Sequence, residues 1–312
     1  MRTNHSALLL TALLCVAACS STDPSPPASS AGAGSSSAGA AAHAGAAPSI
    51  AEGGAPAAGG STTPQSDVHA FSIQFDYRFD RAGYFDKPER RAALEAAAAR
   101  WSALLTNDFF AVPAGTRLTL IDPEDRTQTI TAELSEDIDD LLVFVGTTEA
   151  LPEGAYGRGG PSGMADSGDS ALNKSFVSRQ TGKRFQPWAG SISFKGSVDY
   201  YFDESPDTDD DVPPDQFDFI SLASHELGHV LGFTASAPFS ALETAATFTG
   251  KTAVAEYGAP VPLTPDLSHL ADGTESHGVE ALMTPRLPKG VRQLPTPLDL
   301  AALEDIGYVL NR

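Results

Sequence analysis

The sequence has almost no cysteine and a shortage of positive charge. Of 312 residues only Cys15 and Cys19 are cysteine, and both lie before residue 20. The chain after Cys19 therefore has no disulfide, and no thiolate to serve as nucleophile or metal ligand. Its 20 Lys and Arg residues stand against 40 Asp and Glu residues, a formal net charge of -20. Because nucleic-acid binding needs a basic surface that displaces counterions from phosphates, we expect no nucleic-acid partner.

A membrane-spanning hydrophobic run is also missing from the N-terminus. The apolar run at residues 7–18 follows Met1 and Arg2, and it is too short to cross a ~30 Å hydrocarbon core as a permanent helix. Its end, Val-Ala-Ala-Cys19, resembles the lipobox of bacterial lipoproteins, where the signal is removed before a cysteine that is then lipidated. The resemblance implies a signal peptide at 1–18 and lipidation of Cys19. Ordinary signal cleavage with release of a soluble protein is the alternative.

Residues 19–66 follow as a segment of different composition. From Ser20 onward it is nearly all Ser, Ala, Gly, Pro and Thr, and Ile50 is its one large apolar residue. Such a segment buries too little surface to offset chain entropy, so we expect a flexible tether behind lipidated Cys19. We expect an exported protein in the bacterial cell envelope, most simply an outer-membrane lipoprotein since Ser20 is not Asp. It would be secreted if the tether is cleaved, and any contact with the membrane is through the lipid anchor only.

Residues 67–312 are long enough for one domain, with an N-terminal lobe at 67–232 and a C-terminal lobe at 233–312. Alternating apolar residues predict a strand at 71–77, and helical spacing predicts a long helix at 89–105. We expect α+β architecture: a small mixed sheet, this helix, a second helix from Phe219, and a loop-rich C-terminal lobe ending in a helix at 297–310. The remaining predicted strands cover 117–121, 127–134, 141–145, 190–194 and 197–202, and a flexible glycine-rich loop near a cleft rim is predicted at 154–168.

The second helix carries the motif with chemistry, because residues 225–229 read HELGH. Residues four apart share one face of a helix, so His225 and His229 can direct imidazole nitrogens at one metal ion. Zinc with nitrogen ligands lowers the pKa of a bound water from about 16 to ~7. Glu226 is placed to take the proton of that water and to pass it to a leaving amine. The pattern predicts zinc-dependent hydrolysis of peptide bonds.

HELGHVLGF at 225–233, followed by ALMTP at 281–285, resembles the metzincin metalloproteases. Their pattern is HExxHxxGxxH with a later methionine turn, which implies a structural role for Met283 beneath the metal. The sequence departs from that pattern at Ala235, where the third histidine is expected and alanine cannot ligate. Leishmanolysin-like enzymes bring the third histidine from farther along the chain, and a matrixin-like variant with a displaced histidine has the same order. The resemblance covers about residues 219–308.

The third ligand is a choice among several residues. The resemblance favours His269, fourteen residues before Met283. His277 is the alternative third ligand, or a residue beside the ligands, and a surface position is the ordinary fate of such a histidine. A carboxylate such as Glu243 or Glu256 is a further alternative, as in zincins that use glutamate.

The segment Asp199–Asp218 concentrates nine acids and contains no Lys or Arg. Oxygens of this kind bind Ca²⁺, which takes about six to eight oxygen ligands. Asp207, Asp209 and Asp211 have the spacing of an EF-hand start, but two prolines replace its glycine-bearing turn. The acidic segment Asp199–Asp218 is therefore interpreted either as a calcium site or as a solvated acidic loop.

Together these features predict an exported zinc metalloendopeptidase that acts on protein or peptide substrates, taken here as a monomer. The alternative is a catalytically silent surface lipoprotein that keeps a metzincin fold as a binding or adhesion module. Hydrolysis of a non-peptide amide or ester would use the same site. Retention of Glu226 favours an enzyme, since a binding module has no physical need for that carboxylate.

Overall fold

The computed structural model describes residues 71–165, 170–203 and 211–311. The proposed signal peptide, Cys19 and the tether lie outside the described residues. A four-stranded sheet has the order β1-β4-β7-β5, in which β1, β4 and β7 are parallel and β5 is antiparallel to β7. Its strands are β1 (Ile73–Asp76), β4 (Leu141–Thr147), β5 (Gly157–Pro161) and β7 (Ala189–Phe194).

The two faces of this sheet belong to different hydrophobic cores. Alternate residues of β4 point to opposite faces, so Leu141, Val143 and Val145 join one core while Phe144 joins another. The larger core contains α1 (Pro88–Leu104) and α3 (Phe219–Val230). The smaller core contains β2 (Arg117–Ile121) and β3 (Thr129–Glu133), which form a second sheet with β6 (Met164–Ala165), and part of α2 (Ser170–Thr181). Burial on both faces explains why β4 is mostly apolar, and β7 is buried throughout although it contains Ser191 and Ser193.

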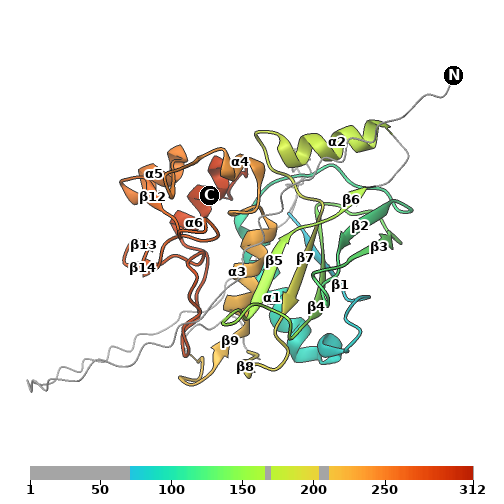
Figure 1. Cartoon of the computed structure of the whole chain (residues 1–312), viewed down its shortest axis with the longest axis horizontal. Coiled ribbons are helices and arrows are strands. Elements are labelled where there is room, and N and C mark those ends of the chain that lie inside the picture. The colour runs from blue at the N-terminus through green and yellow to red at the C-terminus, as the bar shows by residue number, and fades with distance from the viewer. Residues whose placement is uncertain (1–70, 166–169, 204–210, 312) are drawn as a thin grey trace, which may run out of the picture. The chain divides into compact units, whose positions relative to one another are not determined.

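The long predicted helix is confirmed as α1. It starts with Pro88, which suits a first helical turn, and it buries Leu94, Ala98 and Trp101 on one side. The indole Nε1 of Trp101 donates a hydrogen bond of 2.9 Å to the carbonyl oxygen of Ser224 in α3. Figure 1 shows α3 running beside β5, with α1 behind it. The helix that carries HELGH is thus held between the sheet edge and α1.

The chain after α3 is made of short elements, as predicted for the C-terminal part. Figure 1 shows them gathered on one side of α3. The same hydrophobic core continues into them through Leu298, Leu303 and Ile306. Their bounds, with those of the remaining short elements, are η1 (Tyr84–Asp86), β8 (Tyr200–Tyr201), β9 (Phe217–Asp218), α4 (Ala237–Ser240), β10 (Glu243–Thr244), β11 (Thr247–Phe248), α5 (Lys251–Tyr257), β12 (Val261–Pro262), β13 (Glu275–Ser276), β14 (Val279–Glu280) and α6 (Pro297–Asp305).

The mixed α and β class and the small mixed sheet are confirmed, but three local expectations are wrong. The glycine-rich segment is not a loop throughout, because 157–161 is strand β5. Only Tyr200 and Tyr201 are strand in the segment 197–202. Helix α6 ends at Asp305, and Gly307 with φ 107° follows it. Glycine is unfavourable in an isolated strand, so β5 depends on its neighbours rather than on its own propensity.

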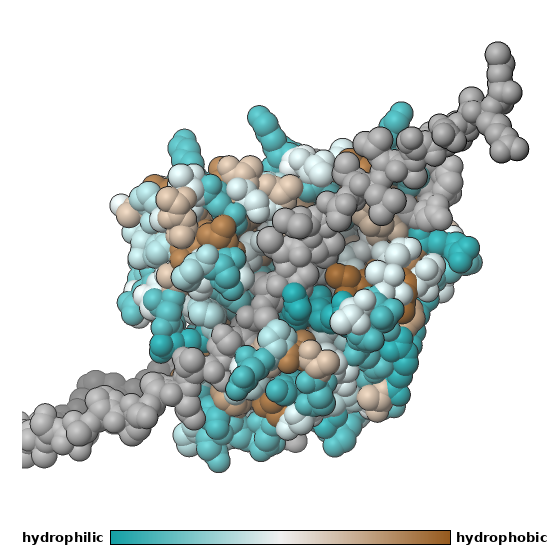
Figure 2. All heavy atoms as spheres, in the orientation of Figure 1, coloured by the Kyte–Doolittle hydropathy of each residue, from teal (hydrophilic) through white to brown (hydrophobic). Residues whose placement is uncertain are grey.

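The surface is dominated by polar side chains. On the face shown in Figure 2, the described residues are mostly hydrophilic, and hydrophobic residues form small separate patches. None of the helices within 71–165, 170–203 and 211–311 has the length and apolar character needed to cross a bilayer.

Candidate metal centre and active site

Helix α3 is fixed at both ends by local chemistry. At its start the Asp218 carboxylate accepts the backbone N–H of Ser221 at 2.9 Å, a side-chain cap that satisfies a free helix donor. At its end Gly232 has φ 104°, a backbone conformation that favours glycine. Every residue of α3 is buried. The sequence therefore produces a short helix whose histidines are delivered into the interior.

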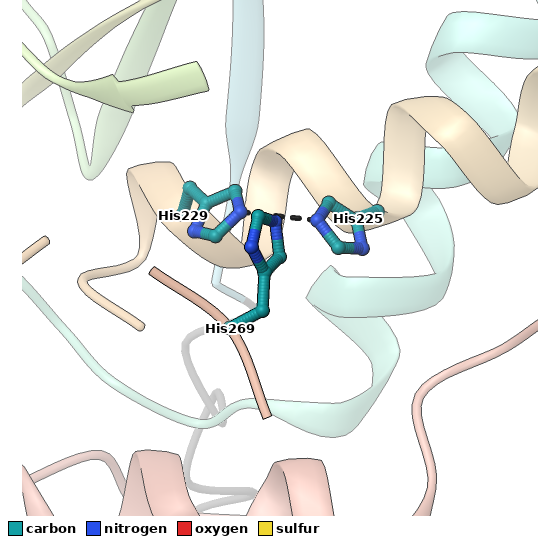
Figure 3. Close-up of side chains that lie close together, drawn as sticks. All are labelled: His225, His229 and His269. Atoms are coloured by element: carbon teal, nitrogen blue, oxygen red, sulfur yellow. Dashed lines mark hydrogen bonds between the residues drawn. The ribbon is translucent and has the colours of Figure 1, made fainter. Parts of the chain in front are cut away.

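Three histidines converge inside the protein. His225 and His229 come from successive turns of α3, and His269 approaches from the chain segment before β13 (Figure 3). The ring centroids of the three are 4.8, 5.2 and 5.1 Å apart. One nitrogen of each lies within 4.8 Å of the others, and all three residues are buried. Within the described part of the chain this is the only group of at least three His, Cys, Asp or Glu residues arranged to hold a metal ion.

The hydrogen bonds of His225 and His229 fix the position of their ring protons. His225 Nδ1 lies 2.7 Å from the carbonyl oxygen of Leu282, and His229 Nδ1 lies 3.1 Å from that of Phe233. A carbonyl oxygen only accepts, so the ring proton of each histidine is assigned to Nδ1. Each Nε2 atom is then unprotonated and has a free lone pair. These two Nε2 atoms are 3.0 Å apart. Two lone pairs at that distance repel unless a cation lies against them.

The third histidine completes the same arrangement. His269 Nε2 is buried and has no hydrogen-bond partner among the described residues. Burial lowers the pKa of His225 to about 4, and burial lowers those of His229 and His269 well below the ordinary value. Neutral imidazoles with free lone pairs are the form that binds metals. His225, His229 and His269 can therefore hold a metal ion.

Glu226 lies next to this centre in the chain and is fully buried. Neither of its carboxylate oxygens has a partner of standard hydrogen-bond geometry among the described residues. Burial raises the pKa of Glu226 to about 8, although the amide of Gly159 and the charges of Arg126 and Arg158 oppose this rise. A buried carboxyl without a partner is costly for folding alone, which is typical of a functional group.

Strand β5 contacts Glu226 directly, a contact that sequence reasoning missed. A side chain at Gly157 would overlap the Glu226 carboxylate, and one at Gly159 would overlap the Glu226 carbonyl oxygen. These two glycines let the edge strand approach the active helix closely. The available signal was the spacing of two between Gly157 and Gly159, which puts these two glycines on one face of a strand.

Met283 packs against the helix that carries the ligands. It is fully buried, and a side chain at Gly228, between the two histidines of α3, would overlap its sulfur. The backbone N–H groups of Leu282 and Met283 donate to the Asp299 carboxylate at 2.9 and 3.1 Å. Met283 thus lies in a turn whose carbonyl at Leu282 orients His225. Asp299 was not foreseen in this role: its spacing from Thr296 is that of a helix capping box, which it forms, but that spacing does not indicate its bonds to Leu282 and Met283.

The alternative third ligands lie elsewhere. The His277 side chain is 74% exposed, and its Nε2 is 2.9 Å from the Glu256 carboxylate. Glu256 also accepts the hydroxyl of Ser276 at 2.9 Å. Glu243 is in β10. The structure brings none of these three residues into the histidine group.

The acidic segment is only partly described, since Glu204, Asp207, Asp209 and Asp210 lie outside the described residues. Of the rest, Asp203 and Asp218 are buried and pair with Arg292 at 2.6 and 2.9 Å. An arginine bound to these carboxylates takes them away from a cation. Calcium at this segment stays a prediction that only its other acids can support.

No protein-family model matches the sequence, and no curated protein matches it either. The functional conclusion therefore depends on the side chains described above.

Proposed function

We propose that this chain is a zinc-dependent endopeptidase with a metzincin-type active site. The observation that carries the proposal is the convergence of three buried histidines, two of which present lone pairs 3.0 Å apart. The next residue after the first of them is a buried carboxylate whose two oxygens have no partner of standard hydrogen-bond geometry among the described residues. A metal site and a proton-transfer group thus adjoin each other.

The donor set favours zinc. Three neutral imidazoles without a thiolate match catalytic zinc sites, which keep a further position open for water or substrate. When bound, zinc would supply Lewis-acid chemistry, lowering the pKa of a water to about 7 and polarising a carbonyl. Leu282 and Phe233 hold the rings of His225 and His229 through their carbonyl oxygens, which keeps the Nε2 lone pairs aimed inward.

Glu226 does the proton work. Its carboxylate oxygen takes a proton from the attacking water and returns it to the amide nitrogen as that nitrogen leaves. The low polarity around it strengthens its interaction with the charge that develops during the reaction. The Glu226 carboxylate lies against Gly157, and the Glu226 backbone lies against Gly159.

The edge of the sheet supports a peptide as substrate. Tyr156 accepts from Lys195 and Ser162 donates to Ala189, so even-numbered positions of β5 hydrogen-bond to β7. Gly157 and Gly159 then direct their backbone groups away from β7, toward the outer edge beside Glu226. Pro161 lies in the same register, where its missing N–H removes no bond to β7. An extended peptide can pair with such an edge, which brings its amide bonds to the active helix.

The proposal is tested by replacing Glu226 with Gln in the purified chain. We expect zinc content to stay near one ion per chain while cleavage of an unfolded protein falls about 10²–10⁴-fold, since the amide cannot accept the water proton. A chelator should abolish wild-type cleavage, and zinc should restore it. His277→Ala is the control and should leave both zinc content and cleavage unchanged. Equal cleavage by wild type and Glu226→Gln would contradict the mechanism, and zinc without any cleavage would favour the binding module.

The proposed cellular location belongs to the N-terminus. We propose that the chain is exported, that its signal is cut before Cys19, and that the lipidated cysteine tethers the domain to the cell envelope. The support is the lipobox-like sequence and the length of the apolar run.

A further inference from the structure

The third ligand is carried by a tight turn between Thr264 and His269. Thr264 N–H donates to the carbonyl oxygen of His269 at 3.0 Å, and His269 N–H donates to the Thr264 hydroxyl at 3.1 Å. Leu267 has φ 61°, a strained value for leucine. His269 therefore lies on a loop, whereas the other two ligands lie on a buried helix.

Asp266 organises this turn with one carboxylate oxygen. Its Oδ1 accepts the hydroxyl of Thr264 at 2.6 Å and the hydroxyl of Ser268 at 2.8 Å. It also accepts the backbone N–H of Ser268 at 3.2 Å. The single hydroxyl proton of Ser268 is thereby committed to Asp266.

The committed proton decides the state of His269. Ser268 Oγ lies 2.8 Å from His269 Nδ1. Because the hydroxyl proton is already used, Oγ can only accept here, so Nδ1 must carry the ring proton. The lone pair is then on Nε2, the buried atom that has no other partner in the described residues. The chain of donors runs from His269 to Ser268 to Asp266.

We infer that Ser268 and Asp266 are positioning residues that hold His269 in its metal-binding tautomer. The inference rests on the proposed metal site. Neither residue touches substrate or metal, and both act through the imidazole. The Asp266 carboxylate, at the end of this series of hydrogen bonds, also makes the His269 imidazole a stronger ligand. A carboxylate that accepts a hydrogen bond, directly or through a hydroxyl, raises the basicity of the ring. Without Asp266, the freed Ser268 hydroxyl can donate to Nδ1 and favour the tautomer with its proton on Nε2, which cannot ligate.

The test uses the full chain with Ser268→Ala, Ser268→Thr and Asp266→Ala. In metal-free protein, ¹⁵N NMR of labelled histidine should show His269 protonated on Nδ1 in wild type and in Ser268→Thr, which keeps the hydroxyl. The proton should move toward Nε2 in Ser268→Ala and in Asp266→Ala. Zinc affinity measured by chelator competition should fall about 10–100-fold in these two variants and recover in Ser268→Thr.

Ser276→Ala is the matched control, because Ser276 also donates to a carboxylate, that of Glu256, but contacts none of the three ligands. It should leave tautomer and zinc affinity unchanged. If Ser268→Ala and Asp266→Ala keep the wild-type tautomer of His269 and the wild-type zinc affinity, the positioning role is overturned, whatever the protease activity. If both effects occur in a protein that cleaves nothing, the proposed endopeptidase fails and the positioning role stands. Urea unfolding of the metal-free variants shows whether a loss of zinc affinity comes from a folding defect. If one of Ser268→Ala and Asp266→Ala does not fold, the other still tests the role.

Discussion

Gly228 occupies the position between the two histidines of α3, where the helix meets Met283. A side chain there would overlap the Met283 sulfur, and Trp101 lies beyond it within ordinary contact distance. The absent side chain therefore lets Met283 pack against the turn of α3 that carries His225 and His229. Helix propensity alone would favour alanine at this position by up to about 1 kcal/mol.

We expect Gly228→Ala to destabilise the protein by about 1–3 kcal/mol, because overpacking outweighs the gain in helix propensity. Urea unfolding of the metal-free chain measures the change. In a Met283→Ala background the overlap disappears, and the same substitution should become neutral or stabilising. An equal loss in both backgrounds would show that Gly228 and Met283 are not coupled.

At this scale, the sequence predicts residues whose geometry is local. A spacing of four on a helix is enough to pair His225 with His229. Such spacing does not identify Asp299 or Asp266, because their roles depend on hydrogen bonds that form only in the folded chain. His269 was favoured over His277 only through a family resemblance, since both are loop histidines. Burial separates them, and burial of a loop is a tertiary property.

Helix α3 depends on a buried charge network at its first turn. Arg292 Nη2 and Nε donate to the Asp218 carboxylate at 2.9 and 3.0 Å, and Arg292 Nη1 lies 2.6 Å from Asp203. The three side chains are almost fully buried. Asp218 is also the cap of α3. The network therefore joins the start of the active helix to the segment after the methionine turn.

We expect Arg292→Ala to cost about 3–5 kcal/mol of folding free energy, since two carboxylates would stay buried without their cation. Arg286→Ala is the matched control in the same segment, because Arg286 pairs with Asp272 while about half exposed. It should cost at most about 1 kcal/mol. Urea unfolding of both variants gives the comparison, and similar losses would contradict the role given to the buried network.

Elements with a strong period are the ones that sequence predicts well. The apolar spacing in α1 and the continuous apolar run at the start of β4 are set by the sheet and core that cover them. Strand β5 has no such pattern, because its glycines serve the approach of α3 and β7 supplies its hydrogen bonds. Helix α2 was not predicted at all, since its sequence is polar and has few strong helix signals.

For the whole molecule, we expect Cys19→Ser to move the chain from the membrane fraction to the soluble fraction of an expressing bacterium. The lipid that is proposed to hold the chain to the membrane would be absent. Labelling with radioactive palmitate should disappear in the same variant. Cys15→Ser is the matched control and should keep label and location. Unchanged labelling in Cys19→Ser would contradict lipidation at this residue.

The lobe boundary predicted at residue 232 marks a change in the regularity of the chain. The packing is continuous across it. One hydrophobic core contains Leu94 of α1, Leu227 of α3 and Leu303 of α6. Sequence shows where composition and regularity change, and here that is the turn after α3. It does not show that the segment after the last helix returns to the end of α1, where the N–H of Asn311 donates to the carbonyl oxygen of Leu104, because that contact joins residues about two hundred positions apart.

The loop position of His269 would give a bound metal ion a second role, that of a cross-link in the chain. A zinc ion bound by His229 and His269 would join positions about 40 residues apart. Closing a loop of that length with a disulfide removes unfolded-state entropy worth roughly 4 kcal/mol, and a metal clip acts on the chain in the same way. The domain has no cysteine, so a bound metal ion would be its cross-link. Unlike a disulfide, this cross-link would be lost whenever the ion is removed.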